Sequence, residues 1–320
     1  GRIVRDDEGN PVYSPGLLKS VKAIGWFIEE YGIAQISMNL TNISITSIHE
    51  AFDETCKRAD ARGIRVTGSE LVGLVPLEAM LEAGRYFLKK QNRSVGVSDK
   101  ELIKIAVKSL GLDDLYPFKP EEKIIEYRME KGKKKDLLVD LSLQGFTEET
   151  ASESPAPGGG SVSAAIGAMG TALGIMVANI SSHKRGWDER WEEFSDIAEQ
   201  GKTIQEKLLH LIDEDTEAFK LIMEAFKLPK KNEEEKEIRK KAIEAATRNA
   251  IQVPVSIMQT CAEAYPVLRS MVEKGNPNSV SDAGVGVLAV HAAIEGAWLN
   301  VKINAAGMEN TEFYKKIEKE

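Results

Sequence analysis

The spacing of apolar residues changes near the middle of the chain. Before residue 130, helical spacing predicts helices over 14–32, 47–61, 77–90 and 98–110. Alternating or short apolar runs in the same region predict strands over 33–40, 64–67 and 123–129. The first part therefore predicts an α+β subdomain in which a small sheet of about three strands is combined with helices.

After residue 140 only helical patterns remain. They predict helices over 161–181, 191–226, 233–269 and 281–304, and so an all-α, up-and-down helical bundle. The 161–181 segment is rich in Ala, Gly and Ser, which allow helices to approach closely, so we expect it to be central and buried. Pro254 and Pro266 predict a kink or a break in the third helix.

Charge supports a boundary between the two parts. Residues 1–135 carry a net charge of +2 and residues 136–320 carry −10, and a lysine-rich segment lies where the balance changes. We therefore expect domains over 1–130 and 136–320, joined by a linker at 131–135. The overall charge of −8 disfavours nucleic acid as a partner.

Composition narrows the class of protein further. No apolar run approaches about 18 residues, which predicts no membrane span. The only two cysteines, Cys56 and Cys261, exclude a disulfide scaffold and suit a reducing cytoplasm. The four histidines lack metal-binding spacing, so we expect no metal site.

A proline- and glycine-rich segment precedes the 161–181 helix. It contains Pro157, Gly158, Gly159 and Gly160, and the helix is expected to begin at Ser161. Free backbone N–H groups at a helix start attract anions, and glycines let a ligand approach the backbone closely. The pattern alone fits a tight turn and a binding loop equally well.

An acidic segment lies inside the 191–226 helix. Residues 213–217 include four carboxylates, most of which should face solvent. Asp215 is the one that shares a face with Leu211 and Ile212, and a desolvated carboxylate has a raised pKa suited to general acid–base work. A wholly solvated acidic face is the alternative, and Asp213, on a different face, is the other candidate.

The last candidate group surrounds the final long helix. Ser281 or Asp282 can cap its start, and Asn300 and Asn304 lie one turn apart near its end. The simpler interpretations are a plain cap for Asp282 and a structural hydrogen bond between helices for the asparagine pair.

Residues 154–165, 213–219 and 281–304, in this order, resemble the formimidoyltetrahydrofolate cyclodeaminase family over about 136–320. The resemblance implies an all-helical domain that dimerises and binds folate in a groove between subunits, with tetrahydrofolate as the substrate carrier and no metal. It implies Asp215 as the acid–base residue. Lys184 and Arg185 are candidates to bind the anionic glutamate tail of the substrate. The other implied substrate-binding residues are Pro157, Gly158, Gly159, Gly160, Ser161, Asp282, Asn300 and Asn304.

Residues 23–28, 33–42 and 68–76 resemble the C-terminal subdomain of glutamate formimidoyltransferase. The two halves in this order resemble the bifunctional transferase-cyclodeaminase family of histidine degradation. In that family a further N-terminal subdomain carries the catalytic histidine, and His49 lies in the wrong subdomain to replace it. We therefore expect an N-terminally truncated piece whose transferase half is inactive alone, with Glu70 helping to orient the formimino group once that subdomain is present.

The resemblance implies an ammonia-lyase that converts 5-formimidoyltetrahydrofolate to 5,10-methenyltetrahydrofolate and ammonia. Its partners would be folate polyglutamates and a second copy of the chain in a dimer or higher homo-oligomer, with no nucleic acid or membrane, in the cytoplasm. Two alternatives stay open: a methenyltetrahydrofolate cyclohydrolase with the same helical domain, and a folate-binding remnant without turnover.

Overall fold

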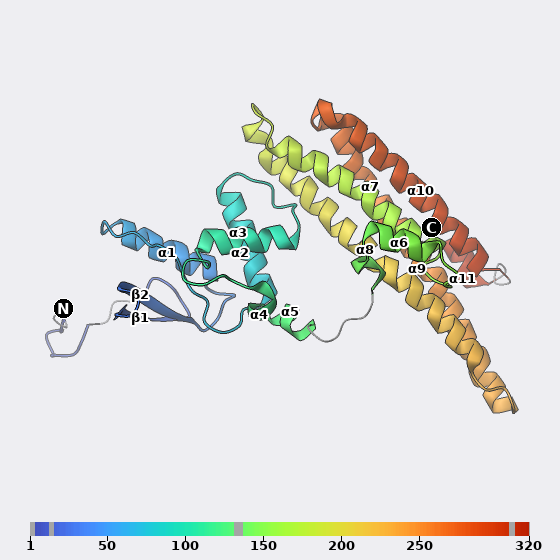
Figure 1. Cartoon of the computed structure of the whole chain (residues 1–320), viewed down its shortest axis with the longest axis horizontal. Helices are drawn as coiled ribbons and strands as arrows, with labels where there is room; N and C mark the ends of the chain where they lie inside the picture. Colours follow the sequence, from blue (N-terminus) through green and yellow to red (C-terminus); the bar gives the residue numbers. More distant parts are fainter. Residues whose placement is uncertain (1–3, 13–15, 131–136, 307–310, 320) are drawn as a thin grey trace. The chain divides into compact units, whose positions relative to one another are not determined.

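The computed structural model describes residues 4–12, 16–130, 137–306 and 311–319. It divides into two compact units (Figure 1): unit 1 comprises Gly1–Phe87 and Asp99–Lys131, and unit 2 comprises Leu88–Ser98 and Gly132–Glu320. The predicted linker at 131–135 lies outside the described residues. The short segment 88–98, which the sequence placed in the first domain, groups with the second unit.

Unit 1 begins with a β-hairpin. Strands β1 (Val21–Ile28) and β2 (Ile33–Leu40) pair antiparallel, with Val21 opposite Leu40. The strand predicted over 33–40 is confirmed, and the helix predicted over 14–32 is wrong over 21–28. Branched and aromatic residues in β1 suit a pleated strand, and Gly32, at φ +63°, closes the hairpin turn instead of ending a helix.

The other two predicted strands are also wrong. Residues 64–67 form no strand, and the 120–130 segment forms two short helices, α4 (Pro120–Lys123) and α5 (Ile125–Glu130). Pro120 and the acidic residues that follow it suit the first turn of a helix. Only an isolated parallel bridge joins Ile124 to Val75, so the sheet within the described residues has two strands.

Three helices complete unit 1 as predicted: α1 (Ile48–Asp60), α2 (Leu77–Lys90) and α3 (Asp99–Leu110). Ser47 starts α1 with a capping box that includes Glu50. Helices α2 and α3 are in close contact at Gly84, where an added Cβ atom would overlap the Leu102 backbone. Their apolar faces supply the core of this unit.

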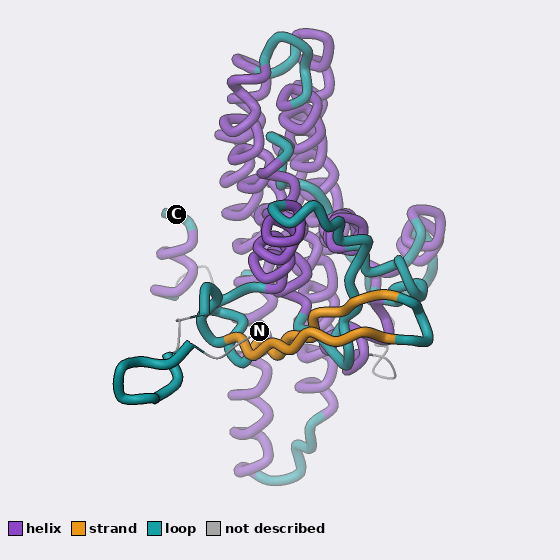
Figure 2. The backbone as a smooth tube through the Cα atoms, turned by 90° about the vertical axis from the view of Figure 1, so that its left-hand side faces the viewer, coloured by secondary structure: helices purple, strands orange, loops and turns teal. Residues whose placement is uncertain are grey.

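Unit 2 is a bundle of four long helices, which Figure 2 shows running side by side. They are α7 (Gly159–Ser182), α8 (Trp191–Lys227), α9 (Glu233–Lys274) and α10 (Val280–Asn304). Short elements flank them: η1 (Leu138–Asp140), α6 (Leu143–Thr150), η2 (Asp188–Arg190), η3 (Pro277–Ser279) and α11 (Glu312–Ile317). The contacts show that successive long helices run antiparallel.

Helix α7 is central, as predicted, and packs against α8, α9 and α10. Its glycines permit the close packing: a Cβ at Gly167 would lie 2.6 Å from Cys261 Sγ, and one at Gly170 would lie 2.8 Å from the Gly286 oxygen. Helix α9 continues through Pro254 and Pro266, so neither proline breaks it.

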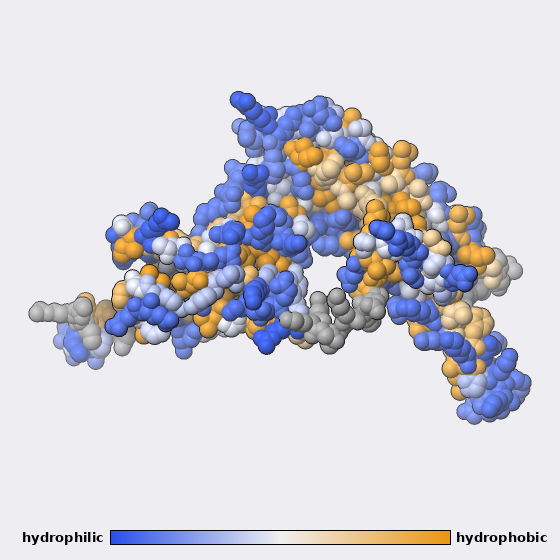
Figure 3. Space-filling model, viewed as in Figure 1, coloured by the Kyte–Doolittle hydropathy of each residue, from blue (hydrophilic) through white to orange (hydrophobic). Residues whose placement is uncertain are grey.

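Two helical segments are long and apolar enough to cross a membrane by composition alone. Helix α7 is mostly buried inside the bundle, which accounts for its hydropathy. In the most apolar 18-residue window of Pro277–Asn304, which includes α10, only 28% is buried. Four large apolar residues of α10, which we call the α10 stripe, are each 55% to 70% exposed: Val285, Leu288, Leu299 and Ile303. Figure 3 shows hydrophobic residues gathered on the surface of this unit.

Candidate active site

The glycine-rich segment leads into the start of α7 at the middle of α8. Gly158 is extended and has no side chain with which to cap the helix, and the helix begins at Gly159, two residues earlier than the sequence predicted. The segment is therefore both a turn and a helix start. One N–H group of this helix start, that of Ser161, donates to the carboxylate described next.

Asp215 of α8 lies against this helix start. Its Oδ2 accepts a hydrogen bond of 2.8 Å from the Ser161 backbone N–H and lies 3.0 Å from Ser161 Oγ. The same hydroxyl is 2.9 Å from the Ile212 carbonyl oxygen. Since the hydroxyl has one proton, it can donate to only one of these acceptors at a time, and when it donates to Ile212 its oxygen can accept a hydrogen bond from a protonated Asp215.

Glycines make this close approach possible. A Cβ at Gly160 would overlap the Asp215 carboxylate, and one at Gly159 would lie 2.8 Å from Asn300 Nδ2. Neither glycine needs a left-handed backbone, so their role here is to leave room. The predicted residues Gly159, Gly160, Ser161, Asp215 and Asn300 are thus brought together.

Burial raises the pKa of Asp215 above its ordinary value, and the two hydrogen bonds from Ser161 offset part of that rise. The neighbouring carboxylates differ: Glu214 pairs with His210 at 3.0 Å and Glu217 with Lys220 at 2.8 Å, both in exposed positions. Glu214 and Glu217 therefore form a solvated face, and Asp215 is not part of it. A carboxyl group with a raised pKa is a better base than an ordinary carboxylate and can return the proton that it accepts.

Asp213 has a structural role in this fold. Its two oxygens accept hydrogen bonds from the backbone N–H groups of Leu138, at 2.7 Å, and Val139, at 3.3 Å. They satisfy the start of the short helix η1, where N–H groups have no partner within the helix. The geometry therefore favours Asp215 over Asp213 as the acid–base group.

The two asparagines do different things. Asn304 Nδ2 donates to the Ala250 carbonyl on α9 at 2.8 Å, which is the structural hydrogen bond between helices that the sequence left open. Asn300 Nδ2 donates to the Gly296 carbonyl of its own helix at 2.9 Å and stays beside Gly159. Only Asn300 lies at the start of α7.

Asp282, Lys184 and Arg185 lie elsewhere. Asp282 is in the first turn of α10, 18 residues before Asn300, or about 27 Å along the helix. Lys184 follows the end of α7, and its Nζ sits 4.0 Å from the centroid of the Trp187 ring. Within one copy of the chain these three residues do not join the Asp215 group.

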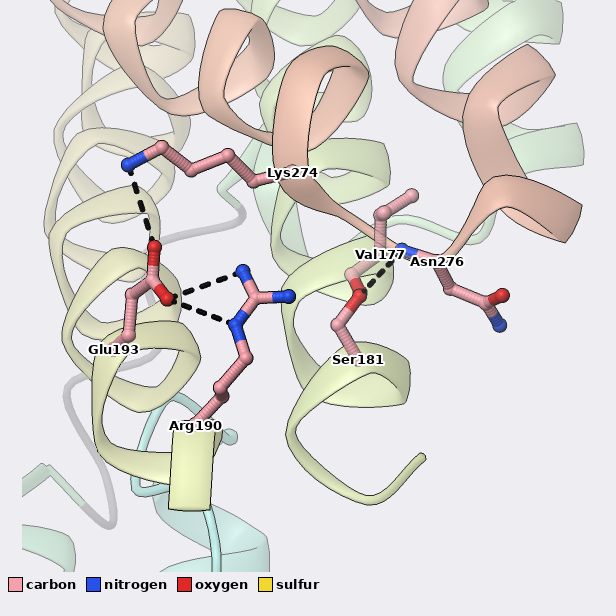
Figure 4. A network of polar contacts seen from close by, with 6 residues as sticks. All are labelled: Val177, Ser181, Arg190, Glu193, Lys274 and Asn276. Atoms are coloured by element: carbon pink, nitrogen blue, oxygen red, sulfur yellow. Dashed lines mark hydrogen bonds and ion pairs between the residues drawn. The ribbon is translucent and has the colours of Figure 1, made fainter. Parts of the chain in front are cut away.

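Polar contacts hold that far end of the bundle together (Figure 4). Glu193 of α8 accepts from Arg190, at 3.1 Å, and pairs with Lys274 of α9, at 3.3 Å. Burial favours the neutral form of Glu193, but these two cations lower its pKa below the ordinary value. The Asn276 N–H donates to Ser181 Oγ of α7 at 2.9 Å.

Sequence reasoning missed Thr216 as a part of the site. Its side chain is 8% exposed, and its Oγ1 lies 3.3 Å from Ser161 Oγ. The available signal was a hydroxyl residue that directly follows Asp215 inside an amphipathic helix. It extends the polar network around the carboxylate.

In unit 1, Glu70 is exposed in the 68–76 segment. Sequence reasoning missed a tyrosine pair there: the hydroxyls of Tyr31 and Tyr116 lie 2.7 Å apart. The hydrogen bond between Tyr31 and Tyr116, with smaller contributions from burial and from the charges of Tyr116, Glu30 and Glu70, raises the pKa of Tyr31 to about 12. Glu70 thus lies near an exposed pair of hydroxyl groups.

A helical bundle that holds a partly buried carboxylate against a glycine-rich helix start has the features of an enzyme that moves protons on a bound substrate. Comparison with protein-family models matches residues 2–130 to the formiminotransferase domain and residues 142–320 to formiminotransferase-cyclodeaminase. The chain belongs to the formimidoyltransferase-cyclodeaminase family.

Individual relatives agree with this assignment. The formimidoyltransferase-cyclodeaminases of Mus musculus and Sus scrofa are each 37% identical to the chain, over 97% and 99% of its length. The chain spans 57% and 59% of the lengths of those two relatives. A methenyltetrahydrofolate cyclohydrolase of Methylorubrum extorquens is 37% identical over 56% of the chain and 86% of its own length.

A solved structure matches the helical unit. The crystal structure of formiminotetrahydrofolate cyclodeaminase from Thermotoga maritima aligns with a TM-score of 0.50 and 31% identity. It covers 56% of this chain and 86% of the other.

Proposed function

We propose that the helical unit is a formimidoyltetrahydrofolate cyclodeaminase, which forms 5,10-methenyltetrahydrofolate and releases ammonia in histidine degradation. The observation that carries the proposal is the partly buried Asp215 carboxyl, held by Ser161 at the start of α7. The names of the relatives and of the matching structure support the substrate class.

The reaction closes a ring within one molecule. The folate N10 forms a bond to the carbon of the protonated formimino group (–CH=NH2+), the bond from that carbon to the formimino nitrogen breaks, and the N10 proton completes the departing ammonia, which leaves the methenyl cation. Because both nitrogens belong to one substrate, the protein mainly has to hold the reacting atoms close together. The free N–H groups of Gly159 and Gly160, at the start of α7, are our candidates for contacts with the pterin or its linker.

Asp215 is our candidate for both proton transfers. In its ionised form it accepts the N10 proton, and it then donates that proton to the departing amine. A raised pKa favours this exchange because it makes the carboxyl a better base and keeps it protonated nearer to neutrality. Ser161 positions the carboxyl through two hydrogen bonds.

We further propose that a second copy of the chain completes the site. Asp282, Lys184 and Arg185 lie at the opposite end of the bundle from Asp215, and the α10 stripe is exposed between those ends. A two-fold axis across α10 would pair the Asp282 end of one copy with the Asn300 end of the other. The basic pair would then be available to an anionic glutamate tail.

A methenyltetrahydrofolate cyclohydrolase is the second candidate. The observation in its favour is the relative of that name, which matches the helical unit over 86% of its own length. Only the formimino substrate can release ammonia, so the two reactions are separable. The match of residues 2–130 to the formiminotransferase domain favours the deaminase.

The test is methenylfolate absorbance with parallel ammonia detection after addition of 5-formimidoyltetrahydrofolate. Wild type should produce both signals, and Asp215→Asn should lose about 10²- to 10⁴-fold in rate, the usual contribution of a general acid–base group. Asp213→Asn is the matched control, because the Asp213 carboxylate accepts hydrogen bonds from the backbone at η1. Hydrolysis of added methenyltetrahydrofolate without ammonia release would instead support the cyclohydrolase, and binding without turnover would support a folate-binding protein.

The remaining expectations stay predictions from the sequence. They are a role for Glu70 in formimino transfer, folate polyglutamates as the natural substrate, chemistry without a metal, and a cytoplasmic location.

A further inference from the structure

An aromatic residue follows Asp215 at the distance of one helical turn. Phe219 lies four residues after Asp215 on α8, so the two share a side of that helix and are about 6 Å apart along its axis. The proton transfers proposed for Asp215 leave this large apolar side chain without a role.

Phe219 continues the row of α8 residues that faces α7. A Cβ at Gly201 would lie 2.7 Å from the Ile175 side chain of α7. Farther along the row, a Cβ at Gly167 of α7 would lie 3.4 Å from the Leu208 side chain. Because Leu208 follows Gly201 by seven residues and Phe219 follows Leu208 by eleven, all three lie on one side of α8.

Helix α7 covers the earlier members of this row but not the last. It begins at Gly159, and the N–H of Ser161 already donates to Asp215, so α7 has no earlier turn that could cover Phe219. Leu208 is accordingly 0% exposed, whereas Phe219 is 38% exposed. Side chains of a helix lean toward its N-terminus, so the Phe219 ring leans toward Asp215 and the start of α7.

The surroundings of this ring combine an apolar surface with polar groups. Gly158 and Gly159 are exposed, and Asn300 is half-buried beside Gly159. An exposed aromatic ring beside a carboxyl group suits a flat aromatic ligand that carries a nitrogen at its edge, because the two rings can stack while the nitrogen reaches the carboxyl group. In folate, the p-aminobenzoate ring is bonded directly to N10, the nitrogen that loses a proton in the proposed reaction.

We propose that Phe219 is a substrate-binding residue on which the p-aminobenzoate ring of folate stacks, with N10 held toward Asp215. The inference rests on the folate substrate proposed above and adds a contact that moves no proton. The aminobenzoate ring is present before and after ring closure, so the contact stabilises the bound substrate and the transition state alike. Such a contact lowers KM and leaves kcat almost unchanged.

Steady-state kinetics of ammonia release test this role. Phe219→Ala should raise KM about 10- to 100-fold, the usual loss when an aromatic stacking partner is removed, with kcat within a few-fold of wild type. Phe219→Tyr keeps the ring and should restore the wild-type KM. Asp215→Asn should show the opposite pattern, a fall in kcat with little change in KM.

Leu221→Ala is the matched control. Leu221 is 47% exposed on the same helix, but it follows Asp215 by six residues and therefore points to a different side of α8. Its removal should leave KM near the wild-type value. A KM for Phe219→Ala equal to that of Leu221→Ala would overturn the proposal, and so would a loss in Phe219→Ala that is confined to kcat.

Binding without turnover gives an independent measurement. The probe is 5-formyltetrahydrofolate, in which an oxygen replaces the formimino nitrogen so that no ammonia can leave. Calorimetry should give a Kd that is about 10- to 100-fold weaker for Phe219→Ala than for wild type, Phe219→Tyr and Leu221→Ala. An equal Kd in wild type and Phe219→Ala, or no binding to folded wild type, would overturn the proposal. Circular dichroism and thermal melting check that each variant is folded.

Proton NMR of the bound probe identifies the ring that stacks. The aminobenzoate protons should shift upfield in wild type and Leu221→Ala, because they lie over the face of an aromatic ring, and Phe219→Leu should lose that shift. An equal shift in Phe219→Leu would overturn the assignment. Wild type that binds the probe through Phe219 but releases no ammonia would contradict the deaminase alone, and ammonia release with a KM independent of Phe219 would contradict this inference alone.

Discussion

Asp213 and Asp215 stand two residues apart on α8 and face different surroundings. Asp213 accepts from the backbone at η1, and Asp215 is held in a partly buried position by Ser161. The helical period explains the difference, because positions two apart point to different sides of a helix. The sequence could place Asp215 on the apolar side, but the partner of Asp213 lies 75 residues away along the chain and has no signal in the local pattern.

Asp213→Ala should lower stability and leave the chemistry intact. The variant removes the acceptors for the Leu138 and Val139 N–H groups, a loss comparable to that of a helix cap, about 0.5–2 kcal/mol. Urea denaturation measures the stability, and kcat for ammonia release should stay within a few-fold of wild type. A large fall in kcat with unchanged stability would contradict the structural role.

Asp215→Asn should change the pH dependence of stability. Burial raises the folded-state pKa of Asp215 above its ordinary value of 3.8, so the folded protein binds its proton more tightly than the unfolded chain does. The associated stabilisation is full below the ordinary value and is lost as pH rises through the raised folded-state pKa. Asparagine does not ionise, so the unfolding free energy of the variant should increase relative to that of wild type as pH rises above the ordinary value of 3.8 and through the raised folded-state pKa. Parallel stability curves across this range would contradict a raised pKa.

Gly160→Ala should be more destabilising than Gly158→Ala. A Cβ at Gly160 overlaps the Asp215 carboxylate, whereas one at Gly158 meets nothing within 4 Å. Overpacking of this kind costs about 1–3 kcal/mol, and the displaced carboxyl should also lower the rate of ammonia release. The denaturant midpoint of Gly160→Ala should be lower than that of Gly158→Ala. Equal midpoints would show that the carboxylate can move aside without cost and would contradict the prediction.

At the scale of elements, local pattern predicts the long helices well and the hairpin poorly. Helices α7 to α10 each contain many turns, so their period is clear and their ends fall near glycine, proline or polar residues. The β1 segment has apolar residues compatible with helical spacing, and its pairing with β2 decides its structure. That pairing is a tertiary effect that a local window does not contain.

The same limit applies to contacts between elements. Composition suggested that α7 is buried, but not that Gly160 faces Asp215 or that Asn304 binds α9. Nothing in the loop 91–97 signals its partner Asn179, since the loop has too few apolar residues for a period. Which polar residues lie close together, when they are far apart in the sequence, could therefore be learned only from the structure or from a resemblance to known families.

At the scale of the whole molecule, the α10 stripe is an apolar surface that one copy leaves uncovered. Val285 and Leu288 lie one turn apart, as do Leu299 and Ile303, and the two pairs share one side of α10. Exposed apolar residues grouped on one side of a helix commonly mark an interface. It supports the proposed self-association, which would place parts of two copies around each folate.

Leu288→Glu should weaken that association. The substitution puts a charge on a residue that is 69% exposed in one copy and would be desolvated in a dimer. Sedimentation velocity should show a shift from dimer toward monomer, and the rate of ammonia release should fall with it. Ile64→Glu is the control, because Ile64 is similarly exposed in unit 1 and lies outside the stripe. An unchanged sedimentation profile for Leu288→Glu would contradict an interface at the stripe.

The glycines of α7 also fix the position of this helix relative to the carboxyl site. Neighbouring side chains or backbone fill the space beside Gly167, Gly170 and Gly174, so α7 cannot rotate about its axis or slide by one residue without driving a larger side chain into them. Such a shift would carry Ser161 away from Asp215, because both movements act on the whole helix at once. Contacts along α7, several turns away from Ser161 and Asp215, thus set how these two residues are aligned.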